Sequence, residues 1–188
     1  MVERFFERGY ARFGADPALA NWVAAAIGPA RAAMADADLR ARWLTCEGTW
    51  FVGVDALPNT AEGAIGGVAL AGAAVEFAQS LFGALPLHRA QVSTVWPGYP
   101  RPREGEGAAA FGYREKRDAA HVDGVRAEGA ERVRRIDEPH GWILGIPLNA
   151  PGAGQARWWF GKAVTKSSGR GFVRRWRAWR RAIGVRSM

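Results

Sequence analysis

The chain has 188 residues, of which 26 are Lys or Arg and 18 are Asp or Glu, so its formal net charge is +8. This length suits one domain with enough apolar residues for a core. A single cysteine excludes an internal disulfide and a cysteine-based zinc site, and it favours a reducing, cytoplasmic location. We expect no membrane span and no signal peptide, because no apolar run approaches roughly 20 residues and the N-terminal segment has no apolar core.

The first third of the chain has a helical pattern. Asp16 followed by Pro17 is a typical cap and first-turn pair, and it predicts a helix that runs to about residue 27. Gly28 and Pro29 are expected to break that helix. A second helix is then predicted over residues 31–44.

The middle of the chain changes to a strand-like pattern. A small-residue-rich segment over residues 63–83 predicts a packed helix. Gln91 lies in one of the predicted strands, where it could point inward and hydrogen-bond a cosubstrate. The predicted strands cover residues 49–57, 87–96, 111–123 and 141–149. Helices first and strands afterwards favour an α+β fold over a parallel sheet.

The tripeptide His121-Val122-Asp123 carries the clearest chemical signal. In a strand, residues i and i+2 point to the same face, so the imidazole and the carboxylate can converge on one point. These are two of the three ligands of the 2-His-1-carboxylate site that holds non-haem Fe(II). The alternative interpretation is a polar pair in a surface loop.

Other polar residues are weaker candidates. His88, near a strand start, is more simply a packed or half-exposed histidine, and His140 is the alternative third metal ligand. A cluster of arginines forms either a solvated turn or a contact for an anionic substrate, namely Arg132, Arg134 and Arg135.

The C-terminal segment differs sharply in composition from the rest. Residues 151–188 contain eight Arg, two Lys and no acidic residue. Tryptophans among these arginines suit base stacking, so one interpretation is a basic arm that binds nucleic acid or an acidic membrane surface.

The other interpretation is that this tail is read out of frame. Arg-, Gly- and Trp-rich sequence without acids is what a GC-rich gene gives in a shifted frame. Residues 157–166 can be written with codons, their third bases chosen freely, that encode Leu-Val-Val-Trp-Glu-Gly-Ser-His-Glu when read from the third base of each codon. We therefore expect a domain over residues 1–152, a junction between Gly152 and Arg157, and an out-of-frame, poorly structured tail over residues 153–188.

The order RDAAHVDG, GWILGIPLN and shifted-frame LVVWEGSH resembles the bacterial branch of the phytanoyl-CoA dioxygenase-like proteins. These are Fe(II)- and 2-oxoglutarate-dependent oxygenases on a double-stranded β-helix. The resemblance covers roughly residues 49–150. It implies that His121 and Asp123 are iron ligands and that Trp142 lines the 2-oxoglutarate pocket. The implied fold has N-terminal helices packed on an incomplete double-stranded β-helix sheet of the jelly-roll or cupin type.

The chain also departs from this family. No residue after position 150 is a histidine, so the Gly-Ser-His strand end and the distal iron ligand are missing, as is the basic residue that grips 2-oxoglutarate. We therefore expect an inactive chain without catalytic residues of its own. The expected partner of the intact protein is a small-molecule substrate, with no specific nucleic acid. The alternative function is a non-enzymatic domain whose basic arm binds nucleic acid or acidic membranes.

Overall fold

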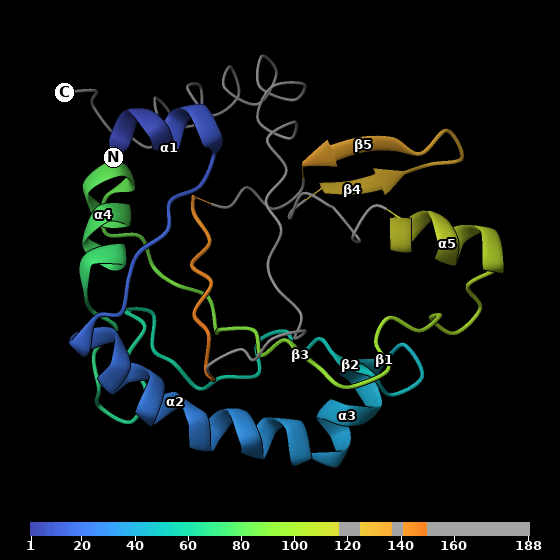
Figure 1. Cartoon of the computed structure of the whole chain (residues 1–188), viewed down its shortest axis with the longest axis horizontal. Helices are drawn as coiled ribbons and strands as arrows, with labels where there is room; N and C mark the ends of the chain where they lie inside the picture. Colours follow the sequence, from blue (N-terminus) through green and yellow to red (C-terminus); the bar gives the residue numbers. More distant parts are fainter. Residues whose placement is uncertain (117–124, 137–140, 150–188) are drawn as a thin grey trace.

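The computed structural model describes residues 1–116, 125–136 and 141–149 (Figure 1). The helices are α1 (Val2–Arg8), α2 (Pro17–Ala35), α3 (Ala37–Trp43), α4 (Ala73–Phe82) and α5 (Ala108–Lys116). The strands are β1 (Leu44–Thr45), β2 (Trp50–Phe51), β3 (Thr94–Val95), β4 (Val125–Glu128) and β5 (Val133–Ile136). One antiparallel sheet has the order β1-β2-β3, and the other pairs β4 with β5. The α+β prediction is therefore confirmed, and the described residues form small sheets and no jelly roll.

Helix α2 begins where the sequence predicts but does not end there. The carboxylate of Asp16 accepts hydrogen bonds from the amides of Ala18 and Leu19, as an N-cap does. The predicted break at Gly28-Pro29 is wrong, because the helix continues through the proline to residue 35. Burial of one helix face on both sides of the proline outweighs the hydrogen bond that proline cannot donate. That buried face consists of Trp22, Ala26, Ala30 and Ala33.

The helix predicted over residues 63–83 is confined to its second half, where α4 lies. The first half cannot be helical because four of its glycines have positive φ angles, which right-handed helices do not contain. Gly66 and Gly67 (φ 57° and 80°) make the tight turn between the bridge partners Ile65 and Val68.

The strand predicted over residues 111–123 is also wrong for its described part, because residues 108–116 form α5. Three consecutive alanines begin this segment and no β-branched residue follows within it, so its intrinsic preference is helical.

The predicted strands 49–57 and 87–96 do lie side by side. Trp50 is paired with Val95 in the β-ladder, and backbone hydrogen bonds beyond it join Val92 N to Gly53 O (2.9 Å) and Leu57 N to Ala90 O (3.0 Å). The regular ladder is shorter than predicted because Gly53, at φ 50°, interrupts the extended backbone.

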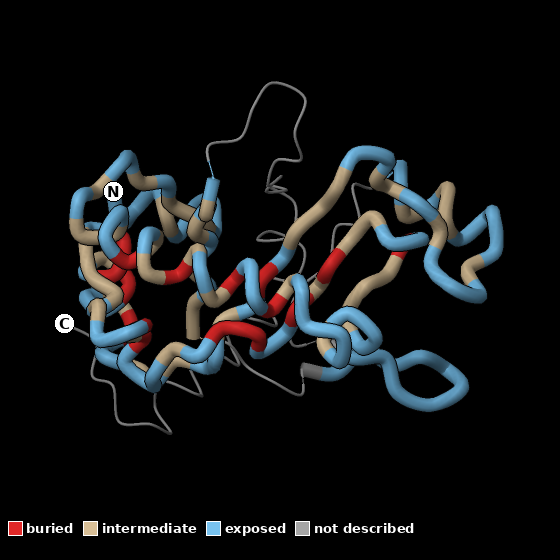
Figure 2. Tube along the Cα trace, turned by 90° about the horizontal axis from the view of Figure 1, so that it is seen from below, coloured by how far each residue is buried: buried red, intermediate tan, exposed pale blue. Residues whose placement is uncertain are grey.

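The hydrophobic core lies between α2, the first sheet and the segment 141–149. Its buried residues run through the interior of the body, while long loops at one end of the molecule are exposed (Figure 2). Phe51 and Ile65 are the largest of the fully buried apolar side chains. Segment 141–149 has no ladder partner among the described residues, yet Ile146 and Leu148 pack against this core.

None of the described helices is both long enough and apolar enough to cross a bilayer.

Candidate functional site

The residues that the sequence singled out lie in different environments. His121 and Asp123 are outside the described residues, as is His140, so their geometry stays a prediction. Trp142 is half-buried at the start of segment 141–149. Gln91 is exposed and alternates with the buried Val92, so it lies on the face of its strand that points away from the core.

The described histidine, His88, is exposed and makes contacts of its own. Within residues 1–116, 125–136 and 141–149, no three side chains of His, Cys, Asp or Glu come together as a metal site. The described part of the chain therefore contains no group of three such side chains that could bind a metal ion.

The structure does describe the chain on both sides of the His121-Val122-Asp123 tripeptide. Helix α5 ends at Lys116, five positions before His121, and β4 begins at Val125, two positions after Asp123. Further downstream, Gly141 approaches the body so closely that a Cβ added there would lie 2.6 Å from Leu85 Cδ1. The tripeptide therefore lies between two described elements, α5 and β4.

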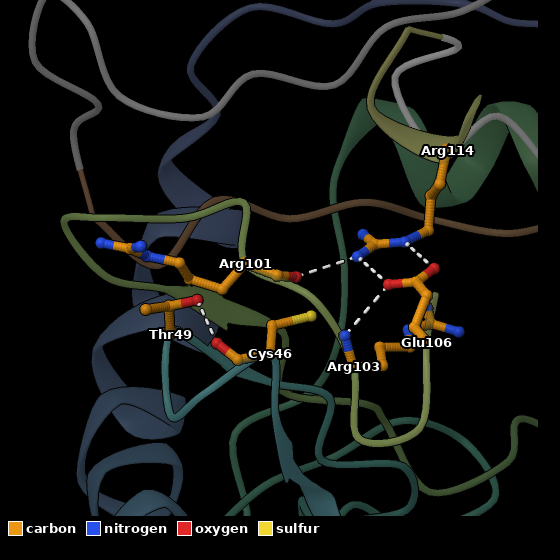
Figure 3. Close-up of polar contacts among 6 residues, drawn as sticks. All are labelled: Cys46, Thr49, Arg101, Arg103, Glu106 and Arg114. Carbon is orange, nitrogen blue, oxygen red and sulfur yellow. Dashed lines mark hydrogen bonds and ion pairs between the residues drawn. The ribbon is translucent and has the colours of Figure 1, made fainter. Parts of the chain in front are cut away.

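On the upstream side, an ion pair attaches α5 to the loop before it (Figure 3). Arg114 Nε donates to Glu106 Oε1 (2.9 Å), and Nη2 donates to Oε2 (2.8 Å). The same Nη2 donates to the carbonyl of Arg101 (2.9 Å), and Glu106 Oε2 accepts from the amide of Arg103 (3.0 Å). With side chains only 13% and 14% exposed, this two-pronged pair fixes one geometry.

The electrostatics of the pair keep both partners charged. Hydrogen bonds from Arg114, and then from the Arg103 amide, lower the pKa of Glu106 to about 2. The bond to Glu106 in turn raises the pKa of Arg114 above its already high value. A carboxylate held in this state is unsuited to general base catalysis near neutral pH. We conclude that Glu106 and Arg114 have a structural role.

Aromatic contacts attach the same loop to the first sheet. The guanidinium carbon of Arg103 lies 5.4 Å from the ring centroid of Trp50, and Tyr99 meets Trp50 edge-on at 6.0 Å. The Trp50 indole also donates to Ser93 Oγ (3.1 Å). Loop and ion pair together form a polar shell around the β1–β2 turn.

Cys46 lies in that turn and is 1% exposed. Figure 3 shows its thiol on the side of the Glu106–Arg114 pair, while its carbonyl accepts from Thr49 Oγ1 (2.6 Å). The sequence did not predict this assembly. Glu106 and Arg114 are eight residues apart and only Arg114 lies in a helix, so helical spacing gives no signal for their pairing.

Comparison of the chain with protein-family models, curated proteins and solved structures gave no significant match. The functional argument therefore depends on the residues of this chain.

Proposed function

We propose that this chain is the N-terminal part of an Fe(II)- and 2-oxoglutarate-dependent oxygenase of the phytanoyl-CoA dioxygenase-like family. The observation that carries the proposal is the spacing of His121 and Asp123, which suits two iron ligands on one strand face. The attachment of the upstream flank supports it. A metal site needs ligands on a backbone that is held in place, and the Glu106–Arg114 pair attaches α5, which ends five positions before His121, to the loop before it.

We further propose that segments 49–57, 87–96 and 141–149 belong to the sheet of a double-stranded β-helix. Hydrogen bonds already join the first two segments over the interval from Trp50–Val95 to Leu57–Ala90. The third packs on the same core through Ile146 and Leu148. Supporting this extension is the alternation of covered and exposed residues over 90–94, which is typical of a strand with one covered face.

For the cosubstrate, Trp142 is the better supported of the two candidate contacts. Trp142 is half-buried near the point where the chain rejoins the body, so its ring can line a pocket. Gln91 is exposed on the outer face of its strand, so it would reach 2-oxoglutarate only from outside the core. Iron held with open coordination positions would supply the oxygen chemistry, with 2-oxoglutarate as reductant.

The chain as it stands is proposed to be inactive. Two protein ligands leave one position of the facial triad without a side chain, and no histidine follows residue 150 to fill it. The acid-free composition of residues 151–188 supports the interpretation of an out-of-frame tail, in which the missing ligand is encoded in the shifted frame.

Succinate formation from 2-oxoglutarate tests this proposal. We expect none above a metal-only control from the chain with Fe(II) and O₂. A version whose frame is restored by one nucleotide between codons 152 and 157 should form succinate, and Asp123→Ala in that version should abolish it. Succinate formation by the unaltered chain, or its absence from the restored version, would contradict the proposal.

The charge of residues 151–188 favours a second candidate function, a basic arm that binds polyanions. Such binding would weaken steeply with salt because phosphate contacts release counterions. Two results would favour this candidate over the oxygenase. DNA binding would be specific, salt-dependent and lost when the tail is removed, and His121→Ala would have no effect on metal binding.

A further inference from the structure

The hairpin formed by β4 and β5 stands apart from the first sheet, close to α5 in the view of Figure 1. Its strands pair over four register positions, from Val125↔Ile136 to Glu128↔Val133. Every residue from 126 to 135 is exposed. These exposed side chains are accessible to a ligand.

The register assigns the charged side chains of the hairpin to two different faces. Arg126 and Glu128 share one face with Val133 and Arg135, and an ion pair across the strands joins Arg135 Nε to Glu128 Oε2 at 2.9 Å. This face is therefore internally neutralised at Arg135.

The opposite face has no acidic residue. Arg134 is paired with Ala127, and its diagonal neighbours across the hairpin are Val125 and Gly129. Arg132 lies in the turn directly before β5, at φ 52°. Among the described residues, neither Arg132 nor Arg134 forms an ion pair. Two guanidinium groups with no ion-pair partner among the described residues thus lie near one end of the hairpin.

We propose that Arg134 and Arg132 form a binding site for a carboxylate or phosphate group of a small-molecule anion. Guanidinium groups present fixed pairs of donors that match both kinds of anion. Arg132 and Arg134 follow the proposed iron ligand Asp123 by nine and eleven positions, at the far end of the hairpin whose first strand begins two positions after Asp123. The assignment of this anion to the oxygenase substrate rests on the proposed function. The binding of an anion by Arg132 and Arg134 is independent of that function.

The charge pattern favours a small anion over a polymer. A nucleic acid or an anionic membrane covers a broad surface, and here it would meet Glu128 and Glu131 on the same short hairpin. A ligand with one or two anionic groups needs only the two arginines, and Arg134 lies on the face of the hairpin opposite that of Glu128.

The test is a titration of the full chain with inorganic diphosphate and, separately, with succinate, followed by NMR at the backbone amides of residues 125–136. Site-resolved signals separate this binding from any binding by the basic tail. The variant is Arg132→Gln/Arg134→Gln, and the matched control is Arg126→Gln/Arg135→Gln, which removes the same charge from the other face. No iron is present, so the result is independent of oxygenase activity.

We expect the first variant to weaken binding at these amides by at least about tenfold, as loss of charge-assisted hydrogen bonds does, and the control to change it by less than about threefold. Response to diphosphate alone would assign a phosphate ligand, and response to succinate alone a carboxylate. Arg134→Lys, which keeps the charge but loses the fork, should bind with intermediate affinity and covers the case in which the double variant does not fold. The proposal would be overturned if neither anion bound, or if variant and control lost affinity equally. It would also be overturned if a DNA oligonucleotide at equal charge concentration displaced the probe.

Discussion

At the scale of single residues, Gly53 is the described glycine at which an added Cβ would make the shortest contacts. A Cβ added there would lie 2.5 Å from the carbonyl oxygen of Val92 and 2.5 Å from Cε1 of Phe51. Gly53 also has φ 50° and is buried between the two paired segments. The absence of a side chain is thus what allows residues 49–57 and 87–96 to approach each other.

We expect Gly53→Ala to destabilise the protein by about 3 kcal/mol or more, from left-handed strain together with overpacking. Gly48→Ala is the matched control, because Gly48 also has positive φ (79°) but a Cβ there would meet nothing within 4 Å. That substitution should cost only the strain, about 1–2 kcal/mol. Urea unfolding measures both values, and equal losses would show that the close contact with Val92 is unimportant.

At the scale of elements, one carboxylate connects the N-termini of two helices. Asp16 Oδ1 caps α2, and Oδ2 accepts from the amide of Ala73 at the start of α4 (2.9 Å). Gly72 permits this approach, since a Cβ there would lie 2.8 Å from the carboxylate of Asp16. The hydrogen bonds from Ala73 and then Leu19 lower the pKa of Asp16, so the carboxylate stays charged at neutral pH.

The substitutions Asp16→Asn and Asp16→Ala separate these two contacts. Asparagine has one acceptor oxygen, so it can keep the cap of α2 but not the second bond to Ala73, whereas alanine loses both. We expect stability to fall in the order wild type, Asp16→Asn, Asp16→Ala, with faster hydrogen exchange at the Ala73 amide in both variants. An Asp16→Asn protein as stable as wild type would show that the bond to α4 contributes nothing.

The Glu106–Arg114 pair predicts a specific dependence of stability on pH. Because folding lowers the pKa of Glu106 from 4.5 to about 2, the stabilising contribution of this carboxylate is complete above pH 4.5 and is lost as the pH falls toward 2. The stability difference between wild type and Glu106→Gln should therefore be greatest near neutral pH and vanish near pH 2.

Unfolding midpoints in urea measure this difference, and comparison with the variant removes the contributions of other carboxylates. Arg114→Lys should show an intermediate difference because lysine keeps the charge but cannot form the two-pronged contact. A difference that stays constant from pH 7 to pH 2 would contradict the assigned pKa.

At the scale of the whole molecule, the parts that sequence analysis predicted correctly are those set by neighbouring residues. The cap at Asp16-Pro17 and the extended segment 87–96 both follow from local chemistry, and both the cap and the pairing of that segment with residues 49–57 are observed. Continuation of α2 through Pro29 depends on burial of the helix face against the rest of the fold, which local pattern does not contain. The contact of Glu106 with Arg114 likewise depends on the path of a loop.

The residues of the candidate sites also differ in how far the sequence alone could predict them. Spacing predicts His121 and Asp123 as ligands, but their geometry lies outside the described residues. Trp142 was predicted from its place in the family order and is half-buried. The arginines at 132 and 134 carried an ambiguous signal, because only the observed register shows that Glu128 neutralises Arg135 and not Arg134.

Equilibrium titration of the full chain with Co(II), as a spectroscopic substitute for Fe(II), tests most directly whether His121 and Asp123 are metal ligands. We predict weak binding of Co(II) by the unaltered chain, because two ligands do not complete the site. His121→Ala and Asp123→Ala should each lower the affinity by a further 10–100-fold or more, in round numbers, since even the loss of an outer partner of a ligand has about that effect. His88→Ala, which replaces an exposed histidine, should leave binding unchanged. Binding that is indifferent to His121→Ala, or tight one-to-one binding by the unaltered chain, would contradict the account.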